Sequence, residues 1–436
     1  MRQRLALCFC FLALAPGASA QEPYRIYSPV KNLATLFTDI FGPQGLRVDS
    51  EATLPGEQQH SAHFNNDFES NFDKFTTAMV GQLVTVPIPS PSAGFTYEFD
   101  PNLGVFKRSS GSFGPILAER AETVGAGRVS LGFSHQHFGF QTVEGLDLNK
   151  VPAVFTHDNA QLLGGRQDVV TTTNAIQATV DQFTTYVTVG VTDRFDVSAA
   201  IKVLSNDLNV VSEATIQRIG TTNELTHFYR LSDGSIGDRR VFHAQGSASG
   251  LGDITVRLKG RMNDHTAAGV DVRLPTGDQM NLLGTGAAGI QPFVIYSTTT
   301  GPLSPHLNAS YQWNGSSILA GSPSTGESAD FPDQVGYAAG ADLALNKRVT
   351  LAFDVLGRYY IKAERLSQET FVARNGVQTF PNIVFARESF NTLNGSMGVK
   401  VNLGGRVLLD ANLLFALDGH GVRDRVTPLV ALEYGF

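Results

Sequence analysis

Apolar and polar residues alternate along most of the chain after residue 127, in segments separated by turn residues. The segment 186–203 reads YVTVGVTDRFDVSAAIKV, with alternation on both sides of residues 192–194. A period of two is typical of a β-strand with one apolar face, and a short polar turn between two such strands predicts a hairpin. The same arrangement returns around residues 346–348 and 404–406. The pattern therefore predicts consecutive antiparallel hairpins.

Twelve segments of this kind can be counted, and short and long connections alternate between them. The predicted strands span residues 128–140, 174–191, 195–213, 253–262, 267–274, 288–297, 304–313, 335–345, 349–362, 389–403, 407–416 and 427–436. The long connections span residues 141–172, 214–250, 275–287, 314–334, 363–388 and 417–426. Because outer-membrane barrels keep short turns at one end and longer loops at the other, we predict an all-β fold, a transmembrane antiparallel up-and-down β-barrel over residues 91–436. Residues 95–124 could add one more hairpin, which gives about 12 to 14 strands.

Charged residues in these segments fall on the face opposite the apolar one. In DITVRLKGRM, Ile254, Val256 and Leu258 share one face, and three cations share the other. A watery lumen accepts such charges at lower cost than a dry core. The same phase predicts ten lumen-lining charges: Arg257, Lys259, Arg261, Asp271, Arg273, Asp342, Asp354, Arg358, Asp410 and Glu433. They are interpreted as a salt-bridge lattice that stiffens the wall or as a selectivity lining, and the two roles can coexist.

The last segment, VTPLVALEYGF, alternates up to its terminal aromatic residue. Aromatic residues near strand ends are typical of the girdles of a membrane barrel. Tyr296, Trp313 and Tyr359 also lie near predicted strand ends. We interpret this segment as the strand that closes the barrel, with Tyr434 and Phe436 as the signal for the barrel-assembly machinery.

Residues 21–90 lack this alternation and show the spacing of short amphipathic helices. NLATLFTDIF, residues 32–41, places apolar residues on one helical face. A second apolar stripe consists of Phe64, Phe68, Phe72, Phe75 and Met79. We interpret residues 21–90 as a helical plug in the barrel mouth; the alternative is a periplasmic segment packed under the rim.

Residues 1–20 have the features of a signal peptide, with Arg2 and Arg4, an apolar run and a small-residue cleavage site after Ala20. Both cysteines lie in this segment, so the mature chain is expected to have no disulfide and no zinc site built from thiolates. Without the leader, 31 basic and 40 acidic residues give a net charge of −9. An acidic chain with scattered basic residues argues against nucleic-acid binding.

Three motifs resemble chemical sites without meeting their requirements. GTGAAG at residues 284–289 matches the dinucleotide fingerprint, but a strand-like segment follows it where the fingerprint needs a helix. His135 and His137 share a strand face with no third ligand nearby in sequence, so we interpret them as polar lumen lining. GSASG at residues 246–250 has alanine where a nucleophile elbow needs serine. We predict no catalytic residue, no metal site and no cofactor.

Two stretches of the chain carry a family resemblance. They are residues 93–138, from AGFTYEFDPNLG to SHQHF, and residues 252–293, with GDITVRLKGRM and RLPTGDQMNLLGTGAAGIQPF. Both resemble the MetA-pathway phenol-degradation family of outer-membrane proteins, which is similar in turn to the long-chain fatty-acid channel superfamily. The likeness covers most of residues 95–436. It implies a β-barrel that takes up small hydrophobic or aromatic compounds, with no catalytic residues to carry over.

The expected function is therefore passive uptake of small, hydrophobic or aromatic molecules through the outer membrane of a Gram-negative bacterium. An enzyme is not expected. Two alternatives stay open: a lipase- or esterase-like enzyme in the same scaffold, and a non-conducting barrel whose long loops bind a surface partner. The expected partners are outer-membrane lipid, the barrel-assembly machinery and the small solute, and nucleic acid is not among them.

Overall fold

The computed structural model describes the parts of the chain that follow the predicted leader, with gaps. The described residues are 25–42, 45–51, 64, 74–79, 82, 90, 94–100, 105–108, 111–156, 168–220 and 222–436. The predicted signal peptide therefore lies outside the described residues. No helix in the described ranges is long and apolar enough to cross a bilayer.

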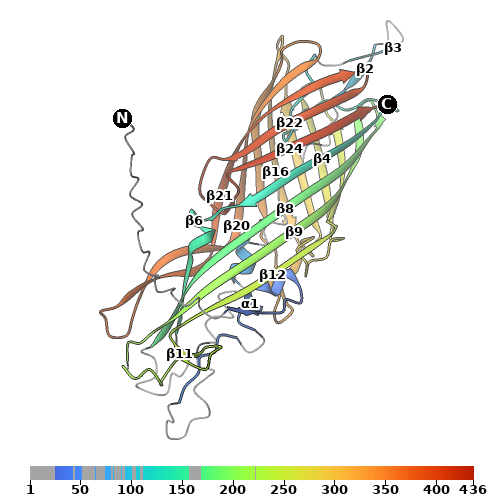
Figure 1. Cartoon of the computed structure of the whole chain (residues 1–436). Coiled ribbons are helices and arrows are strands. Elements are labelled where there is room, and N and C mark those ends of the chain that lie inside the picture. Colours follow the sequence, from blue (N-terminus) through green and yellow to red (C-terminus); the bar gives the residue numbers. More distant parts are fainter. Residues whose placement is uncertain are drawn as a thin grey trace, which may run out of the picture.

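Twelve antiparallel strands close into a barrel within the described part of the chain, as predicted (Figure 1). In chain order they are β4 (Val129–Phe140), β8 (Val169–Thr192), β9 (Phe195–Gln217), β13 (Ile254–Arg261), β14 (Thr266–Leu274), β15 (Gly289–Ser297), β16 (Leu303–Asn314), β19 (Gln334–Ala344), β20 (Val349–Val372), β21 (Thr379–Gly404), β22 (Val407–Ala416) and β24 (Val426–Gly435). Neighbours in sequence are neighbours in the sheet, which is the up-and-down order.

The first and last of these strands close the barrel. β24 pairs with β4, with Leu429 opposite Gln136 and Gly435 opposite Ser130. The amide of Phe436 donates a further hydrogen bond of 2.7 Å to the carbonyl of Val129. Closure leaves no free sheet edge in the wall, which a lipid environment requires.

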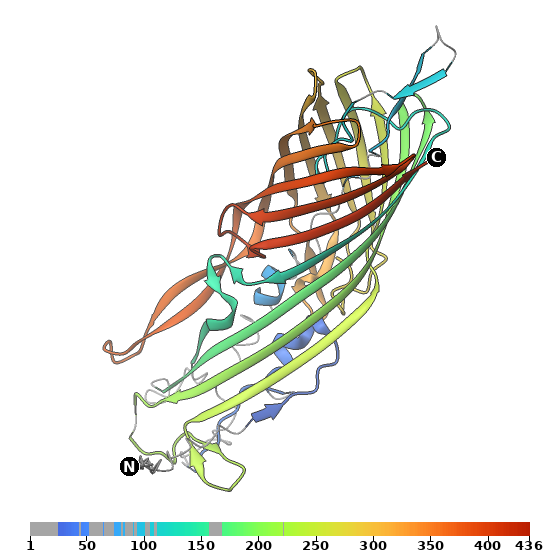
Figure 2. The same ribbon diagram turned by 45° about the horizontal axis from the view of Figure 1, so that its top comes forward.

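The possible additional hairpin within residues 95–124 does not enter the wall. β2 (Tyr97–Asp100) and β3 (Val105–Arg108) pair only with each other within the described residues. Figure 2 shows this hairpin projecting from the barrel end that also holds the C-terminus. The barrel therefore has twelve strands, the lower value of the expected range.

Each wall strand carries an apolar stripe on its outer face. On β24 the burial alternates along the whole strand, with Val430 and Leu432 exposed and Leu429 and Ala431 buried. The exposed apolar side chains form a belt around the wall at the end with the short turns. An apolar belt of this kind suits lipid, because lipid removes the cost of exposing it to water.

Four strands continue far beyond the belt, which corrects two predicted loops. β20 and β21 pair as far as Val372 and Thr379, so most of the predicted loop 363–388 is strand. The predicted loop 214–250 contains β12 (Arg239–Leu251), which pairs with the outer part of β9. Figure 1 shows these long strands reaching past the barrel on the side away from the C-terminus.

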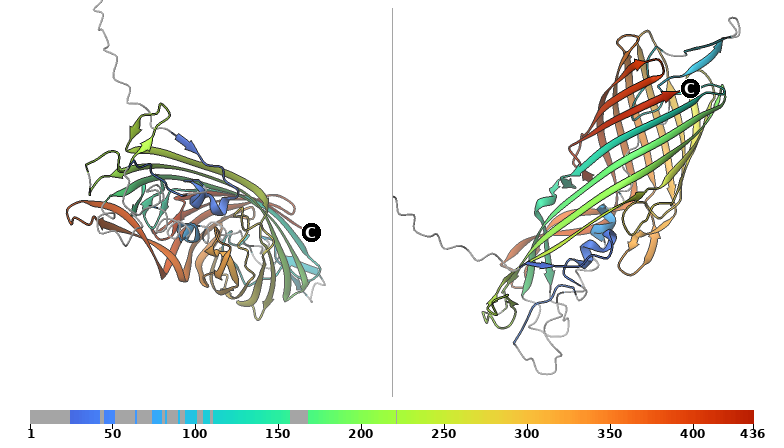
Figure 3. Two further views of the ribbon diagram at one scale, coloured as in Figure 1. Left: turned by 90° about the horizontal axis from the view of Figure 1, so that it is seen from below. Right: turned by 45° about the vertical axis from the view of Figure 1, so that its right-hand side comes forward.

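Shorter elements accompany the wall strands and their extension beyond the belt. They are β1 (Arg25–Tyr27), η1 (Leu33–Thr35), α1 (Leu36–Asp39), β5 (Thr142–Val143), β6 (Leu146–Asp147), η3 (Leu148–Lys150), β7 (Val151–Thr156), β10 (Tyr229–Arg230), β11 (Ile236–Gly237), β17 (Ser316–Ser322), β18 (Glu327–Asp330) and β23 (Val422–Arg423). α1 packs on β12, and β1 adds to β12 in parallel. Seen from below in Figure 3, these N-terminal elements lie inside the curve of the long strands.

Candidate functional site

The segment of residues 111–124 contains no strand and crosses the lumen inside the wall. At its start, the amide of Phe113 donates a hydrogen bond of 3.0 Å to Thr350 of β20. Further on, Ala121 packs against Ala267 and Ile295, on β14 and β15. It therefore touches strands on different sides of the barrel and obstructs the lumen near its short-turn end. We call it the inner segment.

Charged wall residues hold the inner segment in place. Arg257 pairs with Asp271 of the neighbouring strand at 2.6 Å and with Glu119 of the inner segment. Lys259 donates hydrogen bonds of 2.6 and 2.8 Å to the carbonyls of Arg120 and Glu122. Buried charges are tolerated where each one has such partners. These side chains therefore anchor an internal segment as well as bracing the wall.

A second charged group lies where the inner segment begins. Lys400 pairs with Glu433 at 2.8 Å and with Asp410 at 3.5 Å. Glu433 also accepts a hydrogen bond of 2.8 Å from the amide of Gly94. Close by in the wall, His306 contacts Asp354 at 2.6 Å, and Asp342 accepts a hydrogen bond from Ser112.

The structure places all ten predicted lumen charges on the strand face opposite the apolar belt. Nine of them take part in the ion pairs or side-chain hydrogen bonds described above or in contacts of the same kind, namely Arg257, Lys259, Arg261, Asp271, Arg273, Asp342, Asp354, Asp410 and Glu433. Arg273 and Arg358 also face a cavity.

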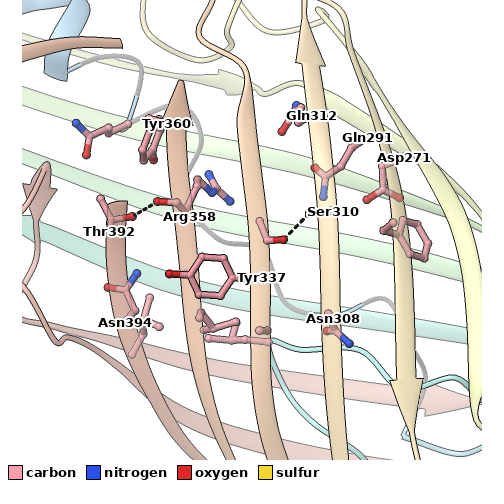
Figure 4. Close-up of a pocket in the computed structure, with 18 of the residues that line it drawn as sticks. Asp271, Gln291, Asn308, Ser310, Gln312, Tyr337, Arg358, Tyr360, Thr392 and Asn394 are labelled. Atoms are coloured by element: carbon pink, nitrogen blue, oxygen red, sulfur yellow. Dashed lines mark hydrogen bonds between the residues drawn. The ribbon is translucent and has the colours of Figure 1, made fainter. Parts of the chain in front are cut away.

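The cavity has a volume of about 310 Å³ and lies between the inner segment and the N-terminal elements. Leu117 and Glu119 of the inner segment line it, and Gln82 lines it from the N-terminal side. Figure 4 shows polar side chains of β14 to β21 on its wall, including Gln291 and Arg358. Phe138, Phe140 and Leu414 add an apolar part. Its size suits a small molecule.

The N-terminal elements form an apolar core at the far end of the lumen. Phe37 of α1 meets Phe75 edge to face with ring centroids 4.9 Å apart, and Phe75 meets Phe385 of β21 at 6.2 Å. Phe64, Phe75 and Met79 of the predicted stripe are all buried. Residues 74–79 are helical, as their spacing indicates. Phe68 and Phe72 lie outside the described residues.

Three parts of the second stretch of family resemblance, residues 252–293, meet at one carboxylate. Asp253 accepts hydrogen bonds from the amides of Gly277 and Thr285 at 3.2 and 2.8 Å, and from the Thr285 hydroxyl at 2.7 Å. A Cβ on Gly284 would collide with this carboxylate, so a side chain does not fit there. GTGAAG therefore belongs to a loop anchored to Asp253, and β15, a strand, follows it as expected.

Outside the membrane-spanning part, Asp168 and His227 form a buried pair at 2.8 Å. Burial alone would raise the pKa of Asp168. Hydrogen bonds from His227 and from the amides of Gly220 and Ile219 outweigh burial, and the pKa lies below its ordinary value. The pair ties the connection after β9 to the start of β8.

The prediction that His135 and His137 line the lumen is wrong. Their strand buries Gln136 and Phe138, so both histidines point to the outer face, where they contact Asp181 of β8 at 3.0 Å each. His135 also stacks on exposed Phe183. Beyond the belt, on the side away from the short turns, apolar side chains point inward and polar ones outward. The prediction assumed the opposite orientation along the whole strand. In the described ranges no cluster of three potential ligands could hold a metal ion.

The family described as "Putative MetA-pathway of phenol degradation" matches residues 163–377. The family resemblance is confirmed over these residues, which include the second stretch, residues 252–293, but not the first, residues 93–138. The match spans β8 to β20 and includes the Asp253 loop. No curated protein matches this chain.

Several solved outer-membrane barrels are similar in fold. An outer-membrane channel from Pseudomonas putida F1 is 13% identical with a TM-score of 0.43, over 72% of this chain and 98% of that one. A Pseudomonas aeruginosa FadL homologue is 9% identical with a TM-score of 0.32, over 71% and 90%. The P. putida toluene transporter TodX is 9% identical with a TM-score of 0.31, over 71% and 89%. All three are described as channels, transporters or homologues of one.

Sequence reasoning missed three side chains that matter for the lumen. Lys202 faces the cavity, Glu119 binds Arg257, and His306 lies between two aspartates. The alternation of apolar residues over 195–203 already places Lys202 on the lumen face, so its position could have been predicted from the sequence. Glu119 had no such signal, because the inner segment is not a strand.

Proposed function

We propose that the protein is an outer-membrane channel that lets small hydrophobic or aromatic molecules enter passively. The observation that carries the proposal is a lumen cavity of about 310 Å³ inside a closed barrel. The inner segment and the N-terminal elements bound this cavity on two sides, and neither is part of the wall. The wall itself is fixed by strand pairing. Such a chamber can pass a solute when the segments shift.

The chemistry of the cavity and the family both support an aromatic solute. Aromatic side chains of β4 and β15, among them Phe138 and Phe293, line the cavity beside polar groups. The matching family is named for phenol degradation. An organism that degrades an aromatic compound must first admit it through its outer membrane.

The outer membrane is the proposed location, with the short-turn end facing the periplasm. The apolar belt suits lipid, and the long connections at the other end suit the cell surface. The segment 1–20 is proposed as the export signal.

Uptake by intact cells tests the function. Gram-negative host cells that express the protein are expected to take up radiolabelled toluene severalfold faster than cells with the empty vector. Planar bilayers with purified protein are expected to show discrete conductance steps. Unchanged uptake with folded barrel present overturns the proposal, and a silent bilayer with esterase activity favours an enzyme.

A further inference from the structure

The cavity holds more positive than negative charge. Lys202, Arg273 and Arg358 all line it. Lys202 is only 7% exposed. The charged groups that act on its ammonium are Arg273, Arg358 and Asp253. Burying like charges together is costly unless an anion offsets them.

Asp253 is already engaged by its own loop. Its two oxygens accept the three hydrogen bonds from Gly277 and Thr285, and its nearest cation is Arg273 at 3.7 Å. Among the described residues, three acidic ones line the cavity itself. Asp271 and Glu119 pair with Arg257, and Asp424 accepts hydrogen bonds from the amide of Gly139 and the hydroxyl of Thr427. The carboxylate nearest in charge balance to Lys202 is therefore already committed to its own loop and to Arg273.

Lys202 is the clearest member of this group. Within the described residues its ammonium makes no hydrogen bond and no ion pair, although the side chain is more than nine-tenths buried. It reaches the cavity from β9, and Figure 4 places Arg358 on the wall formed by β20. Lysine and arginine bind carboxylates through short charge-assisted hydrogen bonds.

The apolar lining of the cavity favours an anion that carries an aromatic ring. The rings of Phe138 and Phe140 lie nearly parallel, with centroids 6.0 Å apart, and both line the cavity with Leu117 and Leu414. An inorganic anion would leave this apolar surface in contact with water. A volume of about 310 Å³ accommodates one substituted ring.

We propose that the cavity binds an aromatic carboxylate, with the carboxylate on Lys202 and Arg358 and the ring toward Phe138 and Phe140. The proposal rests on the proposed function and names aromatic acids as the solutes that this cavity binds most tightly. Arg273 adds to the positive electrostatic potential of the cavity. Its guanidinium donates a hydrogen bond of 2.6 Å to Asn314, so it orients the ligand less directly.

Calorimetric titration of the full-length protein in a non-ionic detergent tests the site. Benzoate, benzyl alcohol and acetate are the three probes, because they separate the charge from the ring. Benzoate is expected to bind about tenfold or more tightly than either of the others, as one charged hydrogen bond contributes about 1.5–3 kcal/mol. Equal affinity for benzoate and benzyl alcohol, or for benzoate and acetate, overturns the proposal.

Variants locate the charge. Lys202→Gln is expected to weaken benzoate binding about tenfold and to leave benzyl alcohol binding unchanged. Arg358→Gln is the second variant, in case Lys202→Gln fails to fold, and Lys347→Gln in an exposed turn is the matched control. Folding is checked by the gel shift between unboiled and boiled samples. Wild-type benzoate affinity in both cavity variants overturns the site.

The two proposals fail in different ways. If toluene uptake rises but benzoate shows no preference over benzyl alcohol, the channel stands and the carboxylate site falls. If benzoate binds through Lys202 but neither uptake nor conductance changes, the binding site stands and the channel falls.

Discussion

Single charged side chains do most of the positioning inside this barrel. Asp253 is 1% exposed and accepts three hydrogen bonds from the loop of residues 275–288. That loop in turn buries Leu282 and Leu283 in the core with the N-terminal elements. One carboxylate on the wall thus fixes a loop that helps to hold the lumen closed.

Asp253→Ala is expected to release the loop without unfolding the barrel. Each of the donors left unpaired costs about 1–3 kcal/mol, whereas the strand pairing of the wall is unaffected. Limited proteolysis of folded protein should cut within residues 275–288 in the variant and not in wild type. Asp264→Ala is the control, because that carboxylate lies in a turn with 82% of its side chain exposed. Equal resistance of both variants would contradict the role of Asp253.

Asp168 makes the backbone hydrogen bonds of Ile219 and Gly220 dependent on pH. Its pKa in the folded protein lies below its ordinary value, so the carboxylate stabilises the fold above the unfolded pKa of about 3.9. This stabilisation is lost as the pH falls through the lower, folded-state pKa. Amide exchange at Ile219 and Gly220, corrected for intrinsic rates, should accelerate at acidic pH in wild type. In Asp168→Asn it should be fast already at neutral pH; identical protection in both proteins would refute the role.

At the scale of elements, the alternation predicted the wall and failed where the wall ends. On β9 the apolar residues Val197 and Ile201 point outward in the belt, but Leu204 and Leu208 point inward beyond it. The strand continues while its apolar face changes sides, because lipid gives way to an internal core. The prediction assumed that each strand keeps its apolar residues on one face along its whole length. It therefore ended β9 too early, assigned β12 to a loop and placed His135 on the wrong face.

The terminal strand carries a prediction on assembly. Phe436→Ala, or loss of the last three residues, is expected to reduce the amount of folded barrel in the outer membrane, since we propose that the assembly machinery reads Tyr434 and Phe436. Unboiled and boiled samples on a denaturing gel measure the compact form. Tyr296→Ala removes a comparably exposed aromatic residue from a mid-chain strand and is expected to assemble normally. Equal amounts of compact form in wild type, in Phe436→Ala and in the truncated chain would contradict the proposed signal.

At the scale of the molecule, the sequence predicted the barrel and the strand face of the ten predicted charges, but not the groups to which these charges bind. Residues 111–124 were expected at most to form part of one more wall hairpin, and the structure shows no strand there. Nothing in their pattern indicated a segment inside the lumen. Lys259 was expected to line water, and it binds two of that segment's carbonyls instead. The cavity likewise depends on three parts of the chain that only folding brings together.

Two obstructions lie in series along the lumen, the N-terminal elements and the inner segment. We propose that the first acts as a plug, since Phe37, Phe75 and Met79 are buried in its core, each side chain contributing about 1.5–3 kcal/mol. Deleting residues 21–90 is expected to leave a folded barrel with larger and more frequent conductance steps.

Adding Glu119→Gln to this deletion should enlarge the steps further, because it removes the pairing of the inner segment with Arg257. Changing Phe68, Phe72 and Phe75 together to Ser in the full chain should resemble the deletion more weakly. Planar-bilayer recordings compare the variants, after the gel shift has shown that each one is folded. If the folded deletion variant conducts like the full-length protein, residues 21–90 are not a plug; if Glu119→Gln adds nothing, the inner segment does not limit passage.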